Sequence, residues 1–294
     1  MATRLGLERG LEDTSREDPS RAAGLRQAIR RIEARGDFRR SRRRRGEGEL
    51  IAPGEADEGG LAFGFAPLDQ VFRGGGLAAG GHQMAAPAGY EPWAAAFALT
   101  LMARLAASPA TRPVLIVQAS EAEAEHGPWG AEGLRALGLD LERVGWVRTR
   151  TAQAAVQATD EALKSGAVSA VLLEGGRQAR IDLALTRRFN LAAQASGALA
   201  FMVGGAVEAT SAALTRWRVS PLLSRRVGLT GARPGLGAPA FNLALTRSRL
   251  GPLGQWELEW DCDERIFKPA GPALPLSVAP LAAGRAGPPQ MRAA

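Results

Sequence analysis

The chain has 294 residues, of which 46% are hydrophobic and 23% charged, and its formal net charge is +7 at pH 7. This is enough for one buried core with flanking segments, and without an apolar run of about 18 residues or a signal peptide we expect a cytoplasmic protein without membrane contact. The single cysteine, Cys262, excludes an internal disulfide and a cysteine-rich zinc site.

Two flanking segments precede the predicted core. Residues 1–20 are polar and aperiodic, so we expect them to be disordered. Residues 21–60 comprise a short amphipathic helix and an arginine-rich linker, and the apolar face of the helix carries Leu25, Ile29 and Ile32. A helix this short is marginal by itself, so its apolar stripe must dock either on its own core or on a partner protein.

Much of the positive charge lies in the linker. The arginines that could contact nucleic acid there are Arg39, Arg40, Arg42, Arg43, Arg44 and Arg45. They could neutralise phosphates and give weak, nonspecific, salt-sensitive contact with DNA. The same run also fits a solvated linker, because no aromatic side chains interleave to stack on bases. Both interpretations stay open.

A core over residues 61–268 is predicted from strands that alternate with helices. The strands are expected at 82–86, 113–118, 144–147, 168–173 and 198–203, and the helices at 91–107, 131–137, 152–164 and 182–196. Unalternating apolar strands separated by helices are typical of a mostly parallel sheet that is covered on both faces. The predicted fold class is therefore α/β. Glu121, Glu123 and Glu125 are expected in a solvated loop after the second strand.

The end of the core has a different pattern. Three further strands are expected at 213–219, 240–247 and 255–260, and the alternation in the last one favours an antiparallel extension with one solvated face. In the first of them, Trp217 is expected in the core, and Arg216 and Arg218 are exposed candidates for partner binding on the opposite face. Residues 269–294 are rich in Pro, Ala and Gly and are expected to be disordered.

Two stretches of the core resemble the RecA family. One is LAFGFAPLDQVFRGGGLAAGGHQMAAP at 61–87, which is similar to the approach to the RecA ATPase core. The other is GLRALGLDLERVGWVRTRTAQAAVQATDEALKSGAVSAVLLE at 133–174, which resembles the segment that leads to the Walker B strand and ends here at Glu174. The resemblance covers about residues 61–260 and implies a RecA-like fold.

The phosphate-binding loop of that family is altered in this chain. A working loop needs glycines for close backbone approach, a lysine for the phosphate oxygens and a Ser or Thr for Mg²⁺. The corresponding residues here include Gly89, Tyr90, Glu91, Pro92 and Trp93, with Pro92 and Trp93 at the Lys and Thr places. Proline removes an N–H donor and Glu91 adds negative charge. We expect a degenerate P-loop, no cofactor, no metal, no catalytic residue and no enzymatic activity.

Among RecA-like proteins, the chain resembles the ImuA family of accessory proteins. The motifs are LAFGFAPLDQVFRGGGL, TSAALTRWRVSP at 210–221 and QWELEWD at 255–261. The resemblance implies a role in SOS-induced, error-prone translesion synthesis. It also implies two partners, RecA and the inactive Y-family-like polymerase subunit ImuB, and through them an error-prone replicative polymerase.

Two other classes of function stay open. A DNA-binding or cell-division regulatory module would show salt-dependent DNA affinity, or division arrest without an effect on mutagenesis. A RecA-like ATPase with an atypical loop would bind or turn over ATP, against which Pro92 and Trp93 argue.

Overall fold

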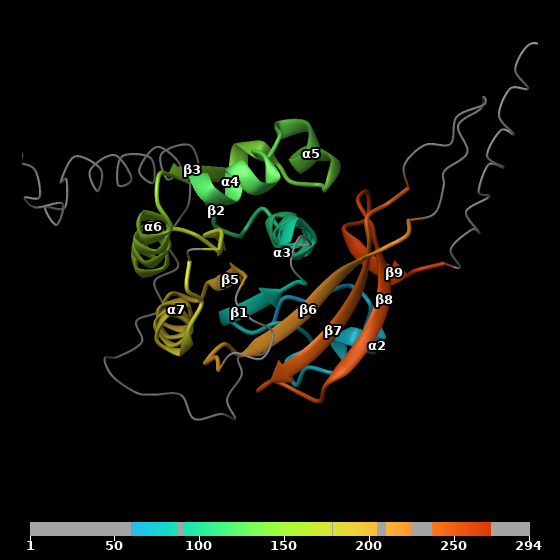
Figure 1. The fold of residues 1–294 in the computed structure, drawn as a ribbon. Coiled ribbons are helices and arrows are strands. Elements are labelled where there is room, and N and C mark those ends of the chain that lie inside the picture. The colour runs from blue at the N-terminus through green and yellow to red at the C-terminus, as the bar shows by residue number, and fades with distance from the viewer. Residues whose placement is uncertain (1–59, 88–90, 178, 205–209, 225–236, 272–294) are drawn as a thin grey trace, which may run out of the picture.

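The computed structural model describes residues 60–87, 91–177, 179–204, 210–224 and 237–271 (Figure 1). Several sequence predictions lie outside these residues. They concern the two terminal segments, the helix with Leu25, Ile29 and Ile32, the arginines from Arg39 to Arg45, and Gly89 and Tyr90 of the loop.

A nine-stranded sheet in the order β3-β2-β4-β5-β1-β6-β7-β8-β9 spans the described residues. Its parallel part comprises β1 (Gly80–Ala85), β2 (Val114–Ala119), β3 (Val144–Thr149), β4 (Ala170–Glu174), β5 (Leu199–Val203) and β6 (Thr215–Leu222). Its antiparallel part adds β7 (Ala240–Ser248), β8 (Gly254–Asp261) and β9 (Ile266–Pro269). This confirms the predicted α/β fold with a mostly parallel sheet, flanking helices and a C-terminal antiparallel extension.

Helices cover both faces of the parallel part. The helices are α2 (Ala66–Asp69), α3 (Glu91–Ala106), α4 (Ser120–His126), α5 (Ala131–Ala136), the 3₁₀ turn η1 (Leu141–Arg143), α6 (Ala152–Ser165) and α7 (Leu183–Ser196). Of these, α3 covers one face, and α6 and α7 cover the other. Consecutive strand residues face opposite sides, so Ile116 joins the core under α3 while Leu115 joins the core under α6 and α7. The two cores explain why β2 and its neighbours are apolar without alternation.

The sequence specifies the ends of α6 and α7. Thr151 caps α6, its hydroxyl oxygen accepting a hydrogen bond from the Ala154 N–H at 3.1 Å, and Gly166 ends the helix in the left-handed conformation. Asp182 caps α7 in the same way through the Leu185 N–H at 2.8 Å. In Figure 1 these two helices lie side by side, away from α3.

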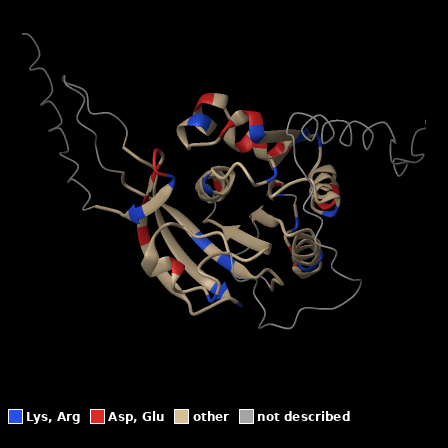
Figure 2. Cartoon of the chain, turned by 180° about the vertical axis from the view of Figure 1, so that it is seen from behind, with Lys and Arg blue, Asp and Glu red and all other residues tan. Residues whose placement is uncertain are grey.

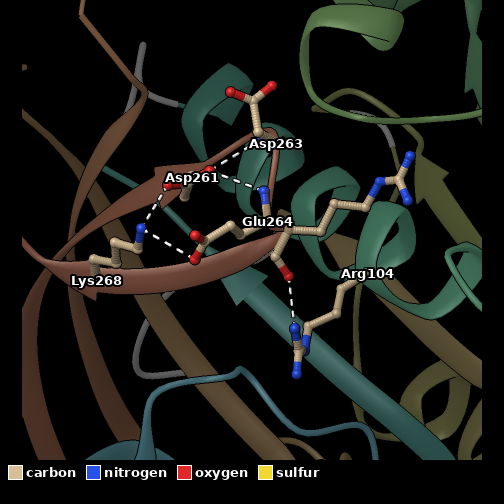
Figure 3. Close-up of polar contacts among 6 residues, drawn as sticks. Arg104, Asp261, Asp263, Glu264 and Lys268 are labelled. Carbon is tan, nitrogen blue, oxygen red and sulfur yellow. Dashed lines mark hydrogen bonds and ion pairs between the residues drawn. The ribbon is translucent and has the colours of Figure 1, made fainter.

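Arg104 ties α3 to the antiparallel extension (Figure 3). Its Nε donates to the carbonyl oxygen of Ala62 at 2.5 Å, and its Nη1 donates to the carbonyl oxygen of Arg265 at 2.7 Å. Burial lowers the pKa of this guanidinium, but its donors are matched by backbone acceptors. Beside it, Lys268 Nζ donates to Asp261 Oδ2 at 2.7 Å and closes the turn between β8 and β9.

The loop expected at Glu121, Glu123 and Glu125 is wrong, because these residues lie in α4. Ala122 is buried on the inner side of this helix, and Glu123 accepts a hydrogen bond from Arg148 Nε at 2.9 Å. Packing against the end of β2 thus orders a segment whose composition alone favours a loop. None of the helices in the described part of the chain is both long and apolar enough to span a membrane.

Candidate functional site

A cavity of about 730 Å³ lies at the carboxyl ends of β1, β4 and β5. Ligands of open α/β sheets bind at this edge, where the strand order reverses. The acidic residues of its lining are Glu91, Glu125, Glu174 and Asp182, and the basic ones are Arg177 and Arg180. The cavity is therefore bordered by more acidic than basic side chains.

Glu174, which ends β4, is 5% exposed at the edge of this cavity. Burial raises its pKa to about 7, although Trp129 Nε1 donates a hydrogen bond to its Oε2 at 2.5 Å. Gln118 lies on the neighbouring strand and also opposes the rise. At neutral pH a substantial fraction of this carboxyl is therefore protonated.

The first turn of α3 lies at the edge of this cavity. Glu91 lines the cavity and places its Oε2 3.9 Å from His126 Nε2. Across the cavity, Glu125 Oε1 lies 3.6 Å from Arg177 Nε. Negative charge at a helix N-terminus that would otherwise cradle phosphate repels a polyphosphate.

Trp93 contributes to the core instead of the cavity lining. Its ring lies 5.9 Å from that of Phe241 on β7 in an edge-on arrangement, and it packs against the aromatic core. Pro92 precedes it in the same turn and carries no N–H. This turn of α3 therefore supplies a packing residue and no cation.

Substituting Trp93→Thr, which introduces the kind of side chain that a phosphate loop carries, is expected to destabilise the protein. We expect a loss of about 1–3 kcal/mol in the free energy of unfolding, because half-buried aromatic area against Phe241 is removed. Urea unfolding measures the loss, and fluorescent ATP titrated into the same variant should still not bind. Unchanged stability together with new ATP binding would contradict this role.

Arg216 and Arg218 do not form the exposed pair that the sequence predicts. Arg216 is 5% exposed, and its Nε donates to Gln83 Oε1 on β1 at 3.1 Å, whereas Arg218 is exposed. Burial and the charge of Arg247 lower the pKa of Arg216. Arg216 is buried because it lies on β6 between β1 and β7, beside a break in the β6–β7 register. The prediction of Trp217 in the core is confirmed.

Sequence reasoning named Glu91, Glu125 and Glu174 separately, but it did not predict that they would line one cavity with further charged residues. Arg177, Arg180 and Asp182 come from the segment between β4 and α7, and Glu125 and His126 come from the end of α4. The available signal was topological, since charged residues that follow consecutive parallel strands meet at one edge of the sheet.

Comparisons with known proteins favour one family. The chain matches no family model. Protein ImuA from each of two strains of Caulobacter vibrioides is 29% identical over an alignment of 217 residues, and the match covers 68% of this chain and 82% of that protein. A crystal structure of SulA from Pseudomonas aeruginosa aligns with a TM-score of 0.32 and 20% identity, covering 41% of this chain and 94% of that chain. About two thirds of the chain is thus similar to Protein ImuA, which supports the ImuA family indicated by the sequence motifs.

Proposed function

We propose that this protein is a non-catalytic accessory protein of SOS-induced, error-prone translesion DNA synthesis. The observation that carries the proposal is the similarity to Protein ImuA over two thirds of the chain. The proposed activity is to connect RecA with an inactive Y-family-like polymerase subunit of the ImuB kind. Through that subunit it would support an error-prone replicative polymerase.

The geometry around α3 supports the non-catalytic part of the proposal. Glu91 faces the cavity, Pro92 lacks a donor, and Trp93 packs in the core. A RecA-like ATPase needs the opposite properties at these places, namely backbone donors, a lysine and a hydroxyl. We therefore propose a degenerate P-loop that binds no nucleotide.

Different segments would serve different partners. We assign the contact with RecA to the apolar stripe of Leu25, Ile29 and Ile32, and a weak contact with DNA to the arginines from Arg39 to Arg45. On the core, Arg218 remains the exposed cation of the predicted pair. The core would then be left to contact the polymerase-like subunit.

A light-scattering and pull-down experiment tests the assignment of partners. Full-length protein is expected to bind RecA and the polymerase-like subunit saturably. A variant with Leu25→Asp and Ile29→Asp is expected to lose binding to RecA and to keep binding to the polymerase-like subunit. The matched control is Arg39→Ser with Arg40→Ser, which should weaken DNA binding and leave both protein partners bound. Absence of binding to both proteins would refute the proposed function while leaving the fold assignment intact.

A further inference from the structure

The solvent face of α7 is unusually apolar. Leu183 is 47% exposed and Leu191 is 43% exposed, and they are two of the five large hydrophobic side chains that are exposed among the described residues. Arg187 lies midway between them and is exposed as well. A spacing of four residues places the three side chains on one stripe about 12 Å long. We call this stripe the α7 outer face.

The side chains of the α7 outer face point away from the core that the described residues form. Leu185, Phe189 and Ala193 on the opposite side of the helix are buried in the core shared with α6 and the sheet. The neighbouring helix α6 shows what an ordinary surface looks like at this place, since its exposed positions include Gln157 and Glu161. The exposed leucines of α7 therefore do not belong to the two cores that the described residues form.

The α7 outer face carries a cation between its two leucines, and its only acidic neighbour within the described helix and its cap is Asp182, which caps the N-terminus. The helix contains Arg187 and Arg188 and no acidic residue. Arg188 is paired with Asp160 of α6 at 3.4 Å, whereas no ion pair joins Arg187 to any residue that the structure describes. Just before the helix, Arg180 is exposed at the cavity edge beside Leu183. Figure 2 shows the basic segments of α7 on the outside of the molecule.

We propose that the α7 outer face docks an amphipathic helix that carries acidic and apolar side chains and belongs to the polymerase-like partner. This inference rests on the proposed function, which supplies that partner. Apolar side chains at every fourth residue with a cation between them are complementary to apolar and acidic positions on a facing helix. Leucines offer neither phosphate contacts nor a stacking surface, so a nucleic acid fits this face less well.

The test compares surface variants of the full-length protein in titrations with the purified polymerase-like partner. The combination Leu183→Glu with Leu191→Glu is expected to weaken binding about tenfold or more, because it removes both apolar anchors and repels acidic residues. Arg187→Glu is expected to weaken binding severalfold and to reduce its salt dependence. Gln157→Glu on α6 introduces the same charge on the adjacent helix and should leave binding unchanged.

Further measurements separate the outcomes. The thermal unfolding midpoint of each variant should stay close to that of the wild type, because all four positions are exposed. A photo-crosslinker at position 187 should capture an acidic, apolar segment of the partner. Wild-type affinity of the double leucine variant for the partner would overturn the inference. So would a variant that loses binding to a labelled oligonucleotide while it keeps binding to the protein partner. Failure of the wild type to bind the partner would refute the proposed function itself and the inference with it.

Discussion

Trp217→Ala is expected to lower the free energy of unfolding by about 4 kcal/mol, which is a large fraction of the stability of a typical domain. Trp217 is fully buried at the centre of the aromatic core. Its ring lies 5.6 Å from Phe63 and from Phe97, 6.2 Å from Phe72 and 6.1 Å from Trp256. Alanine would leave a cavity that the surrounding segments, which come from three parts of the chain, cannot all close.

Trp146→Ala is the matched control for this prediction. Trp146 lies on the edge strand β3 and is 36% exposed, so its loss should cost less than about 1 kcal/mol. Urea unfolding followed by circular dichroism measures both variants without relying on tryptophan fluorescence. Equal losses in the two variants would show that the aromatic core does not dominate stability.

Stability is also expected to depend on pH through two buried groups. The first is His82, which is fully buried on β1. Its Nε2 lies 2.9 Å from the Ala78 carbonyl oxygen, which can only accept, so Nε2 carries the proton. Its Nδ1 then accepts from the Thr215 hydroxyl at 2.8 Å, and that oxygen accepts from Trp217 Nε1 at 3.0 Å. Burial lowers the pKa of His82 from 6.5 to about 4.

Glu174 has the opposite effect, because burial raises its pKa from 4.5 to about 7. Below pH 6.5 the unfolded chain protonates His82 before the folded one does, so this histidine makes the folded state lose stability as pH falls towards 4. Above pH 4.5 the unfolded chain ionises Glu174 before the folded one does, so this carboxyl makes the folded state lose stability as pH rises towards 7. Each contribution amounts to about 3 kcal/mol in full.

The two contributions oppose each other between pH 4.5 and 6.5, and single substitutions should reveal them. Glu174→Gln is neutral and can still accept from Trp129, so its stability relative to the wild type should increase as pH rises from 4.5 to 7. His82→Gln should instead gain relative stability as pH falls from 6.5 to 4. Urea unfolding at a series of pH values measures both differences.

Parallel, pH-independent offsets in both variants would contradict this account, because they would show that neither group changes its pKa on folding. The double variant is a further control. Its stability relative to the wild type should show both trends at once, since the two side chains make no hydrogen bond to each other among the contacts that the structure describes.

Local sequence patterns predicted the elements whose signals are local. The helix at 152–164 was correct to within one residue, because Thr151 and Gly166 cap it and its apolar spacing has a helical period. The strand around Ala170–Glu174 followed from an uninterrupted apolar run. By contrast, α4 was missed because SEAEAEH offers a single buried apolar residue, Ala122.

Features that depend on contacts between distant segments were harder to predict from the sequence. Alternation along β6 predicted that Arg216 and Arg218 would be equally exposed, but Gln83 from β1 and a register break beside Trp217 bury the first of them. The cavity combines the ends of β1, β4 and β5 with α4 and the start of α7. No periodicity encodes such a meeting of segments, and the sequence indicated Glu91, Glu125 and Glu174 only as separate positions.

Calorimetric titration of the full-length protein with the purified ImuB-like polymerase subunit, with and without ATP and Mg²⁺, tests the proposed function most directly. We expect saturable binding with the same dissociation constant in both conditions, because Glu91, Pro92 and Trp93 in the first turn of α3 supply neither a lysine nor a hydroxyl to a nucleotide. Absence of binding, or binding that requires ATP, would contradict a non-catalytic accessory role in error-prone DNA synthesis.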